Sequence, residues 1–107
     1  MQRKETAELR LSVAWYKPEQ WNRLLEISAD AAELEATFAE WLIHAEKTLK
    51  ALGRRGVFPE KVDLDTEALL AWCNERNLKI NSESRSQYAS WLLKEQDKGN
   101  KRKRKRR

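Results

Sequence analysis

The feature that most constrains this chain is a long amphipathic pattern between residues 30 and 53. At about 100° per residue, its large apolar side chains fall into one narrow stripe made of Leu34, Phe38, Trp41, Ala45, Leu49 and Leu52. Asp30 and Glu33 fit a capping box at the start of a helix, and Gly53 fits the left-handed position that ends one. We therefore predict a central helix over 30–52, on which the rest of the chain packs.

The composition limits the kinds of protein to which such a helix can belong. The chain has 107 residues, of which 40% are hydrophobic and 36% charged, and this is typical of one small helix-rich domain. Five Trp residues can supply much of a core, because each indole buries about 150–250 Å². The sequence has no apolar run of about 18 residues and no basic-then-apolar leader, so we expect neither a membrane span nor a signal peptide. A single Cys favours a cytoplasmic protein without an internal disulfide.

Shorter patterns on both sides of the central helix predict the other elements. Residues 9–15 alternate apolar and polar side chains, which is the period of a strand with its Leu, Val and Trp face on the core; a helix is the alternative. A short helix over 18–28 begins with Pro at its first position. Val62 and Leu64 alternate with charged residues, and a strand over 60–64 can pair with 9–15 as a two-stranded ribbon.

Two further helices are predicted after the second strand. Asp65 caps the first of them, which runs to about Asn77, a residue suited to the left-handed stop position. Asn81 or Ser82 caps the second, which ends before Gly99. The inward face of this last helix is expected to hold Tyr88, Trp91 and Leu92.

Together these patterns predict an α+β fold that is mainly α. About four helices lie around the long central helix 30–52, with a short two-stranded ribbon of 9–15 and 60–64. A single compact domain covers 1–98, and a flexible, disordered basic tail covers 99–107.

The sequence offers no constellation of residues for catalysis. His44 is the only histidine and Cys73 the only cysteine; the first is expected on a polar helix flank and the second on an inward face, so they cannot form a nucleophilic pair. Zinc needs three or four closely spaced ligands, and three glycines leave no phosphate-binding loop. We therefore expect a protein that is not an enzyme, with no catalytic residue, no metal and no cofactor.

The basic tail is the strongest indication of function. All of its last seven residues are cations: Lys101, Arg102, Lys103, Arg104, Lys105, Arg106 and Arg107. Without them the chain has 15 basic and 17 acidic residues, so the net charge changes from +5 to −2. Such a run binds nucleic-acid phosphates by counterion release, without sequence preference, unless it serves only to keep the chain in solution. In a eukaryotic cell it would also act as a nuclear import signal.

The short connection between the last two helices is compatible with a helix-turn-helix, although a plain helical hairpin is the alternative. In a helix-turn-helix, the first turns of the second helix contact bases, and here they carry Arg85 and Gln87. Glu83 and the acidic preceding helix would oppose this contact, because they repel phosphates.

A stripe of small side chains lies on the central helix, opposite its large apolar side chains. Its residues are Ala32, Ala36, Ala39 and Ile43. The stripe predicts a docking face for another helix, a second copy of the chain in a homodimer, or a different protein. The alternative is that Ala is present only because it is a strong helix former.

These features predict a small accessory or regulatory protein that binds nucleic acid or a nucleoprotein complex. The tail supplies most of the affinity, and the acidic, Trp-rich body makes a protein contact. The alternative is a pure protein-interaction module, an inhibitor or adaptor, whose tail clamps an acidic surface of its target. We expect no membrane partner, and a cytoplasmic location that is nucleoid-associated in a bacterium or nuclear in a eukaryote.

Overall fold

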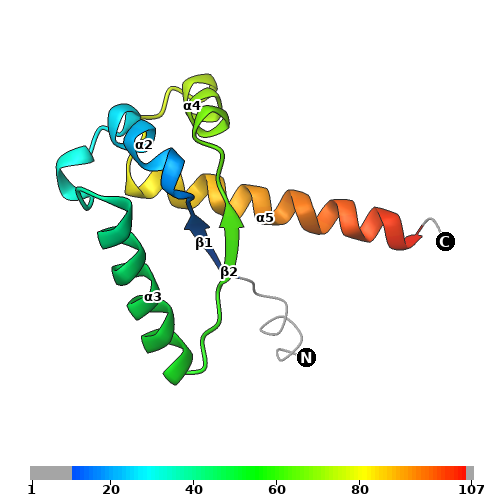
Figure 1. Ribbon diagram of the computed structural model, residues 1–107. Coiled ribbons are helices and arrows are strands. Elements are labelled where there is room, and N and C mark those ends of the chain that lie inside the picture. Colours follow the sequence, from blue (N-terminus) through cyan, green and yellow to red (C-terminus); the bar gives the residue numbers. More distant parts are fainter. Residues whose placement is uncertain (1–10, 106–107) are drawn as a thin grey trace.

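The computed structural model describes residues 11–105, and it describes the side chains of 11–98. The fold is mainly helical with one small sheet, so the predicted fold class is confirmed. In chain order (Figure 1) the elements are β1 Ser12–Trp15, the 3-10 turn η1 Pro18–Gln20, α2 Trp21–Ile27, the 3-10 turn η2 Ala31–Glu33, α3 Phe38–Arg54, β2 Glu60–Asp63, α4 Thr66–Glu75 and α5 Ser82–Lys105.

The sheet consists of the two predicted strands, which pair in parallel. Ser12 lies opposite Glu60, and Trp15 lies opposite Asp63. Parallel strands need a long crossover, and the segment that carries α2 and α3 supplies it. The first half of α5 crosses behind both strands (Figure 1) and covers one face of this small ribbon, which would not be stable alone.

The core lies between the sheet, α2, α4 and the first half of α5. Its buried apolar residues are Tyr16, Trp21, Leu24, Val62, Leu64, Leu69, Cys73, Ile80, Tyr88, Ala89 and Leu93. Val62 of β2 and Leu64, which directly follows this strand, face inward as predicted. No residue of α3 is buried, so α5 rather than α3 is the helix around which the described part of the chain is organised.

The predicted central helix over 30–52 is therefore wrong in its start and in its role. α3 begins only at Phe38, where the Thr37 hydroxyl caps it by accepting a hydrogen bond from the Glu40 amide at 3.2 Å. The expected cap, Asp30, accepts hydrogen bonds at 2.8 Å from the guanidinium of Arg85 instead. The Asp30 side chain makes no cap hydrogen bond to the residues that follow it, and residues 31–33 form a separate 3-10 turn.

The apolar stripe of α3 is used over only part of its length. Leu34, Phe38 and Trp41 pack against the core, whereas Ala45, Leu49 and Leu52 are half-exposed. The second half of α3 extends away from the rest of the described chain (Figure 1), so these last three side chains lack the cover that was expected.

The helix ends follow local rules, with one correction. Gly53 lies inside α3, and the left-handed position belongs to Gly56 at φ 80°. The Val57 amide then donates to the Leu52 carbonyl at 2.9 Å, which closes a Schellman motif. Asn77 at φ 57° ends α4 in the same way, as predicted.

The two predicted N-terminal caps after the second strand are confirmed. The Asp65 carboxylate accepts hydrogen bonds from the amides of Glu67 and Ala68 at 2.8 and 3.0 Å. At the start of α5, the Ser84 amide donates to the Asn81 side chain at 3.0 Å, and the Asn81 amide donates to the Ser84 hydroxyl at 2.9 Å. This reciprocal pair fixes where α5 begins.

α5 does not end before Gly99, as we had predicted, but continues to Lys105. One Gly in a helix costs about 1 kcal/mol relative to Ala, and the run of Lys and Arg that follows at 101–105 consists of good helix formers. The cations that follow also suit the negative end of the helix dipole. Residues 106 and 107 lie outside the described part, and the flexibility of the tail stays a prediction. None of the described helices is long and apolar enough to cross a membrane.

β1 buries a different face from the one predicted. Ala14 and Tyr16 pack into the core, and the Ser12 hydroxyl lies 3.2 Å from that of Ser90 on α5. Trp15 instead contacts Trp41 of α3, with ring centroids 4.9 Å apart. The small side chains of β1 allow α5 to approach closely, and this decides which face is covered. Residues 9 and 10 of the predicted strand lie outside the described residues.

Candidate nucleic-acid interface

α5 is anchored in the fold through an ion pair near its first turn. The Arg85 guanidinium donates to both carboxylate oxygens of Asp30 at 2.8 Å and to the Ser28 hydroxyl at 3.2 Å. The Ser82 amide donates to the same carboxylate at 3.1 Å. Hydrogen bonding from Arg85 lowers the pKa of Asp30. These contacts tie the start of α5 to the segment after α2.

Arg85 is therefore not available as the base-contacting residue that we predicted. Only 7% of it is exposed, and its guanidinium is occupied by the ion pair. Gln87, its predicted partner, is exposed and lies on another side of α5. The structure does not bring the two residues together, so a helix-turn-helix that reads bases with both of them is not supported.

A shallow groove of about 550 Å³ runs between α4 and α5, and Gln87 is one of its lining residues. The lining combines two indoles, two cations, an amide, two hydroxyls and one Leu, and it contains no carboxylate. Its residues are Trp72, Arg76, Leu78, Ser86, Gln87, Ser90, Trp91 and Lys94.

The two indoles that line this groove pack on a third aromatic ring, that of Tyr88, which lies behind them. Tyr88 and Trp91 stack with ring centroids 5.9 Å apart and an interplanar angle of 17°, and Trp72 lies 5.2 Å from Tyr88. Tyr88 is buried, and burial raises the pKa of its hydroxyl. Trp91 was predicted to face inward, but 39% of it is exposed because it lies at the edge of the core. The indole nitrogen of Trp72 is buried without a hydrogen-bond partner among the described residues.

One cation of the groove, Arg76, is held against an indole. The guanidinium carbon of Arg76 lies 4.2 Å from the centroid of the Trp72 ring, and its Nη1 donates to the Trp72 carbonyl at 3.1 Å. Along α5, Gln87, Trp91, Lys94 and Lys98 follow at intervals of four, three and four residues, which places them on one side of the helix. The same period places positions 101 and 105 in this row.

Sequence reasoning found Gln87 and the basic run but missed the groove residues between them. Trp72 and Arg76 were not recognised because the groove lies between two helices. The sequence of one helix does not show which residues of the other helix lie beside it. The spacing of Trp91, Lys94 and Lys98 was a usable signal, since an aromatic residue followed by two cations on one helix side faces solvent more often than core.

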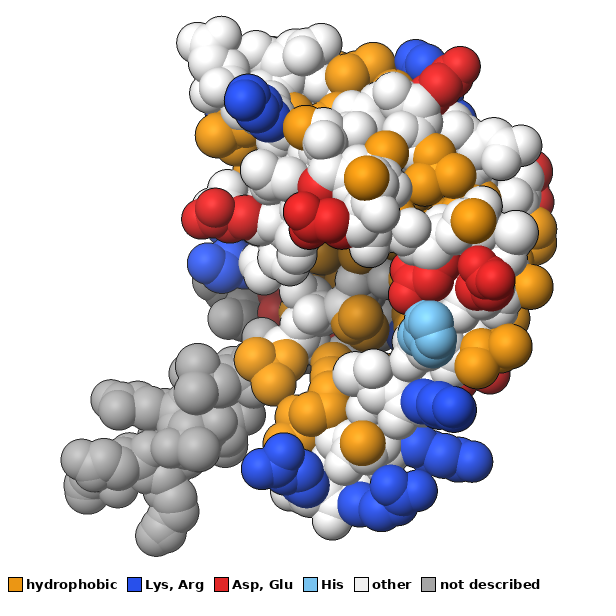
Figure 2. Space-filling view, turned by 90° about the vertical axis from the view of Figure 1, so that its left-hand side faces the viewer, with side chains coloured by type: hydrophobic (Ala, Val, Ile, Leu, Met, Phe, Trp, Pro, Cys, Tyr) orange, Lys and Arg blue, Asp and Glu red, His pale blue; other side chains and the backbone are white. Residues whose placement is uncertain are grey.

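The predicted docking stripe does not form one helix face. Ala32 lies in η2, Ala36 in the connection that follows, and only Ala39 and Ile43 belong to α3. All four residues are exposed, so their role in a protein contact stays a prediction. On the side of the molecule drawn in Figure 2, Lys and Arg side chains gather at the lower end, where α3 finishes.

The two candidate nucleophile partners lie apart, as predicted. Cys73 is fully buried in the core, and His44 is exposed on α3 with its Nδ1 2.7 Å from a carboxylate oxygen of Glu35. This hydrogen bond lowers the pKa of Glu35. The described residues contain no group of three or more His, Cys, Asp or Glu that could hold a metal ion.

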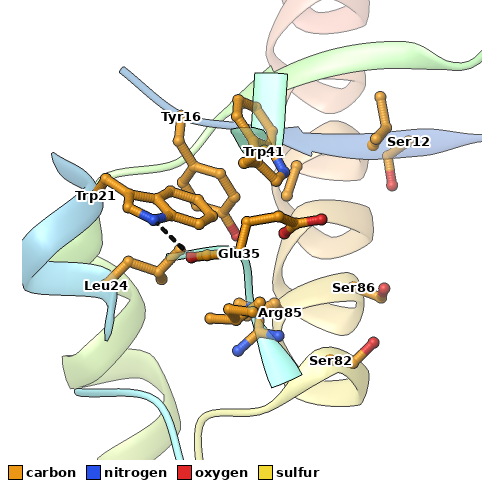
Figure 3. A pocket seen from close by; sticks show the side chains of 12 residues that line it. Ser12, Tyr16, Trp21, Leu24, Glu35, Trp41, Ser82, Arg85 and Ser86 are labelled. Atoms are coloured by element: carbon orange, nitrogen blue, oxygen red, sulfur yellow. Dashed lines mark hydrogen bonds between the residues drawn. The ribbon is translucent and has the colours of Figure 1, made fainter. Parts of the chain in front are cut away.

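A second cavity, of about 320 Å³, lies beside β1 and the start of α5 (Figure 3). Tyr16, Trp21 and Trp41 line it together with Glu35 and Arg85. The Trp21 indole donates to the Glu35 carbonyl at 3.0 Å, and burial raises the pKa of Tyr16 to about 12. The charged groups of its wall are already paired, so a ligand here would have to displace contacts that hold the fold together.

Comparisons with protein-family models, with curated proteins and with solved structures find no match to this chain.

Proposed function

We propose that this chain is a small, non-enzymatic protein that binds nucleic acid through α5. The observation that carries the proposal is the continuity of this helix, which runs from a buried first half to the basic positions 101–105. The basic run therefore extends from an element anchored by Arg85, rather than from a linker.

The charge of α5 suits a phosphate backbone. All five positions 101–105 are cations, so every side of this part of the helix carries positive charge, and duplex DNA carries one phosphate charge per about 1.7 Å of its axis. The net charge of −2 on residues 1–100 would repel a polyanion, so the end of α5 must supply most of the affinity. A protein of this kind would act in the cytoplasm, on a bacterial nucleoid or in a nucleus.

Truncation after Asn100 tests this proposal. Binding of a duplex is measured against salt concentration for the intact and the truncated protein. If all seven cations contact phosphates, log K falls against log salt with a slope of roughly −6, and truncation abolishes binding near physiological salt. The melting temperature should not change, because the buried residues of the described chain all precede residue 94.

A matched control comes from the other basic cluster of the chain, at the end of α3. Replacing Lys47, Lys50, Arg54 and Arg55 with Gln removes four cations without touching α5. This variant should keep the affinity and the salt slope of the intact protein to within one phosphate contact. Equal affinity and slope with and without residues 101–107 would overturn the proposal.

A second candidate function is a protein-interaction module. It is favoured by large apolar side chains that are exposed around α3, namely Leu11, Ile43 and Phe58. In this case the basic end of α5 would clamp an acidic surface of the target. Capture of one protein from native cells, undiminished by nuclease treatment, would favour this function over nucleic-acid binding.

A further inference from the structure

We infer that the groove between α4 and α5 holds an unpaired nucleobase of a single strand whose phosphates lie along α5. This inference rests on the proposed function and adds the class of nucleic acid. Its starting point is Trp91, a large aromatic residue that is 39% exposed and lies directly beside Lys94 in the groove lining.

The wall of the groove is suited to a planar ring. Trp91 stacks on Tyr88, and Tyr88 is itself fixed in the core, so the exposed indole is held in place rather than free to rotate. Nucleobases stack on such aromatic side chains regardless of their sequence, because every base has a π-face. The volume of about 550 Å³ lies within the range of roughly 300–1,000 Å³ that small-ligand pockets have.

The polar groups of the groove select an anionic, hydrogen-bonding ligand over an apolar one. Arg76 and Lys94 contribute positive charge, and the lining residues include no carboxylate, although Arg76 Nη1 also donates to Glu75 beside the groove at 3.4 Å. The Gln87 amide and the two Ser hydroxyls can pair with base edges. An apolar helix docked here would leave these groups buried without partners, which is costly.

The direction of α5 leads from the groove to the basic run. Trp91, Lys94 and Lys98 share a row with positions 101 and 105, and this row spans roughly 21 Å from 91 to 105. A strand with one base on Trp91 could therefore follow the helix with its phosphates. A duplex could use the cations but not the indole, because its bases are stacked inside the helix.

The test compares a single strand with a duplex on the same variants. Fluorescence anisotropy gives the affinities of an oligothymidine of about 12 nucleotides and of a duplex of equal length. Trp91→Ala should weaken single-strand binding by about 5- to 150-fold, the range reported for one stacked base, and leave duplex binding and its salt slope unchanged. Trp91→Phe should retain most of the affinity, since it keeps an aromatic face.

Two further variants separate stacking from charge and from general effects. Lys94→Gln should reduce the single-strand salt slope by about 0.7, the change expected for one lost phosphate contact. Phe58→Ala removes an aromatic ring that is 77% exposed and far from α5 in the sequence, and it should change neither affinity. The far-ultraviolet circular dichroism of each variant shows whether it is folded, and Trp91→Leu, which keeps apolar volume without an aromatic face, replaces Trp91→Ala if the latter is not.

The outcomes distinguish this inference from the proposed function. If the intact protein binds neither oligonucleotide, the proposed function fails and the inference falls with it. If it binds both, and Trp91→Ala changes both affinities equally or changes neither, the groove does not hold a base and only the inference is overturned. The inference would likewise be overturned if an acidic or phosphorylated peptide displaced the bound single strand and this displacement required Trp91.

Discussion

Two groups of aromatic rings in this protein have the same chemistry but different surroundings. The first joins β1, α2 and α3 and consists of Trp15, Tyr16, Trp21, Phe38 and Trp41. The second joins α4 and α5 and consists of Trp72, Tyr88 and Trp91. In the first group the Trp21 indole has a partner in the Glu35 carbonyl, whereas in the second the Trp72 indole has none among the described residues.

This difference shows that the presence of Trp side chains does not by itself identify a binding site. The first group stabilises the crossover of more than forty residues that connects the two parallel strands, and its rings pack around Trp41. The second group comes from neighbouring helices, is open at Trp91 and is bordered by Arg76 and Lys94. The number of aromatic rings does not distinguish a group that stabilises the fold from a group that can bind a ligand. The exposure of the rings and the charged side chains beside them do.

The largest effect is expected from Trp21→Ala in the first group. Trp21 is 2% exposed, contacts three other rings and donates to Glu35. Its loss should lower the free energy of unfolding by about 3–5 kcal/mol, as for other large-to-small core substitutions. Urea denaturation measures this. A variant as stable as the parent would mean that the first group does not hold the crossover.

Asp30→Asn should have an effect of similar size, because it breaks the part-buried ion pair between Asp30 and Arg85. It leaves the Arg85 charge unpaired and should cost about 3–5 kcal/mol at pH 7. The folded-state pKa of Asp30 is lowered, so its stabilising effect is complete above the unfolded value of about 3.9 and is lost as the pH falls through the folded value. The difference between parent and variant should therefore shrink below about pH 4.

The measurement for this pair is the melting temperature as a function of pH. Glu26→Gln is the matched control, because Glu26 pairs with Arg23 at an exposed position and should contribute little at any pH. A difference between parent and Asp30→Asn that stays constant down to strongly acidic pH would show that the carboxylate does not act through its charge.

Trp41→Ala should destabilise the protein less than Trp21→Ala, by about 2–3 kcal/mol, because Trp41 is only half-buried. Leu49→Ala, two turns further along α3, is the control and should have a smaller effect still. Unfolding by guanidinium chloride compares the two. An equal cost for both would mean that the whole of α3 is covered and that its second half packs against a partner.

Trp91→Ala tests the second group and should lower the free energy of unfolding by about 1–2 kcal/mol, less than the core substitutions, because the side chain is 39% exposed although it contacts the rings of Trp72 and Tyr88. The same urea denaturation that is used for Trp21→Ala gives this value. A cost as large as that of Trp21→Ala would remove the contrast between the two groups, and the exposed indole would then be a part of the core.

The smallest change in stability is expected from Ile43→Glu on the exposed face of α3. Ile43 is 55% exposed, so the free energy of unfolding should stay within about 0.5 kcal/mol of the parent. If α3 docks on a second copy of the chain, sedimentation should show weaker self-association in this variant. Unfolding of the variant would mean that this face belongs to the core.

Local rules of sequence predicted many of the features near helix ends and strands. Asp65 and Asn77 were recognised from their residue types, because caps depend on backbone groups within a few positions. The same reasoning failed at Asp30, where a carboxylate that fits a helix cap pairs with Arg85 instead. That partner lies 55 residues away, and no pattern near Asp30 points to it.

The sequence by itself determined the fold class, the positions of the strands and the concentration of charge at the end of the chain, because each follows from neighbouring residues. Only the tertiary structure decided that α5 rather than α3 has the covered face, that Arg85 is buried while Trp91 is open, and that Trp72 meets Trp91 across two helices. The physical reason is that periodicity indicates that a helix has an apolar face. What covers that face depends on which elements the crossover of the sheet brings together.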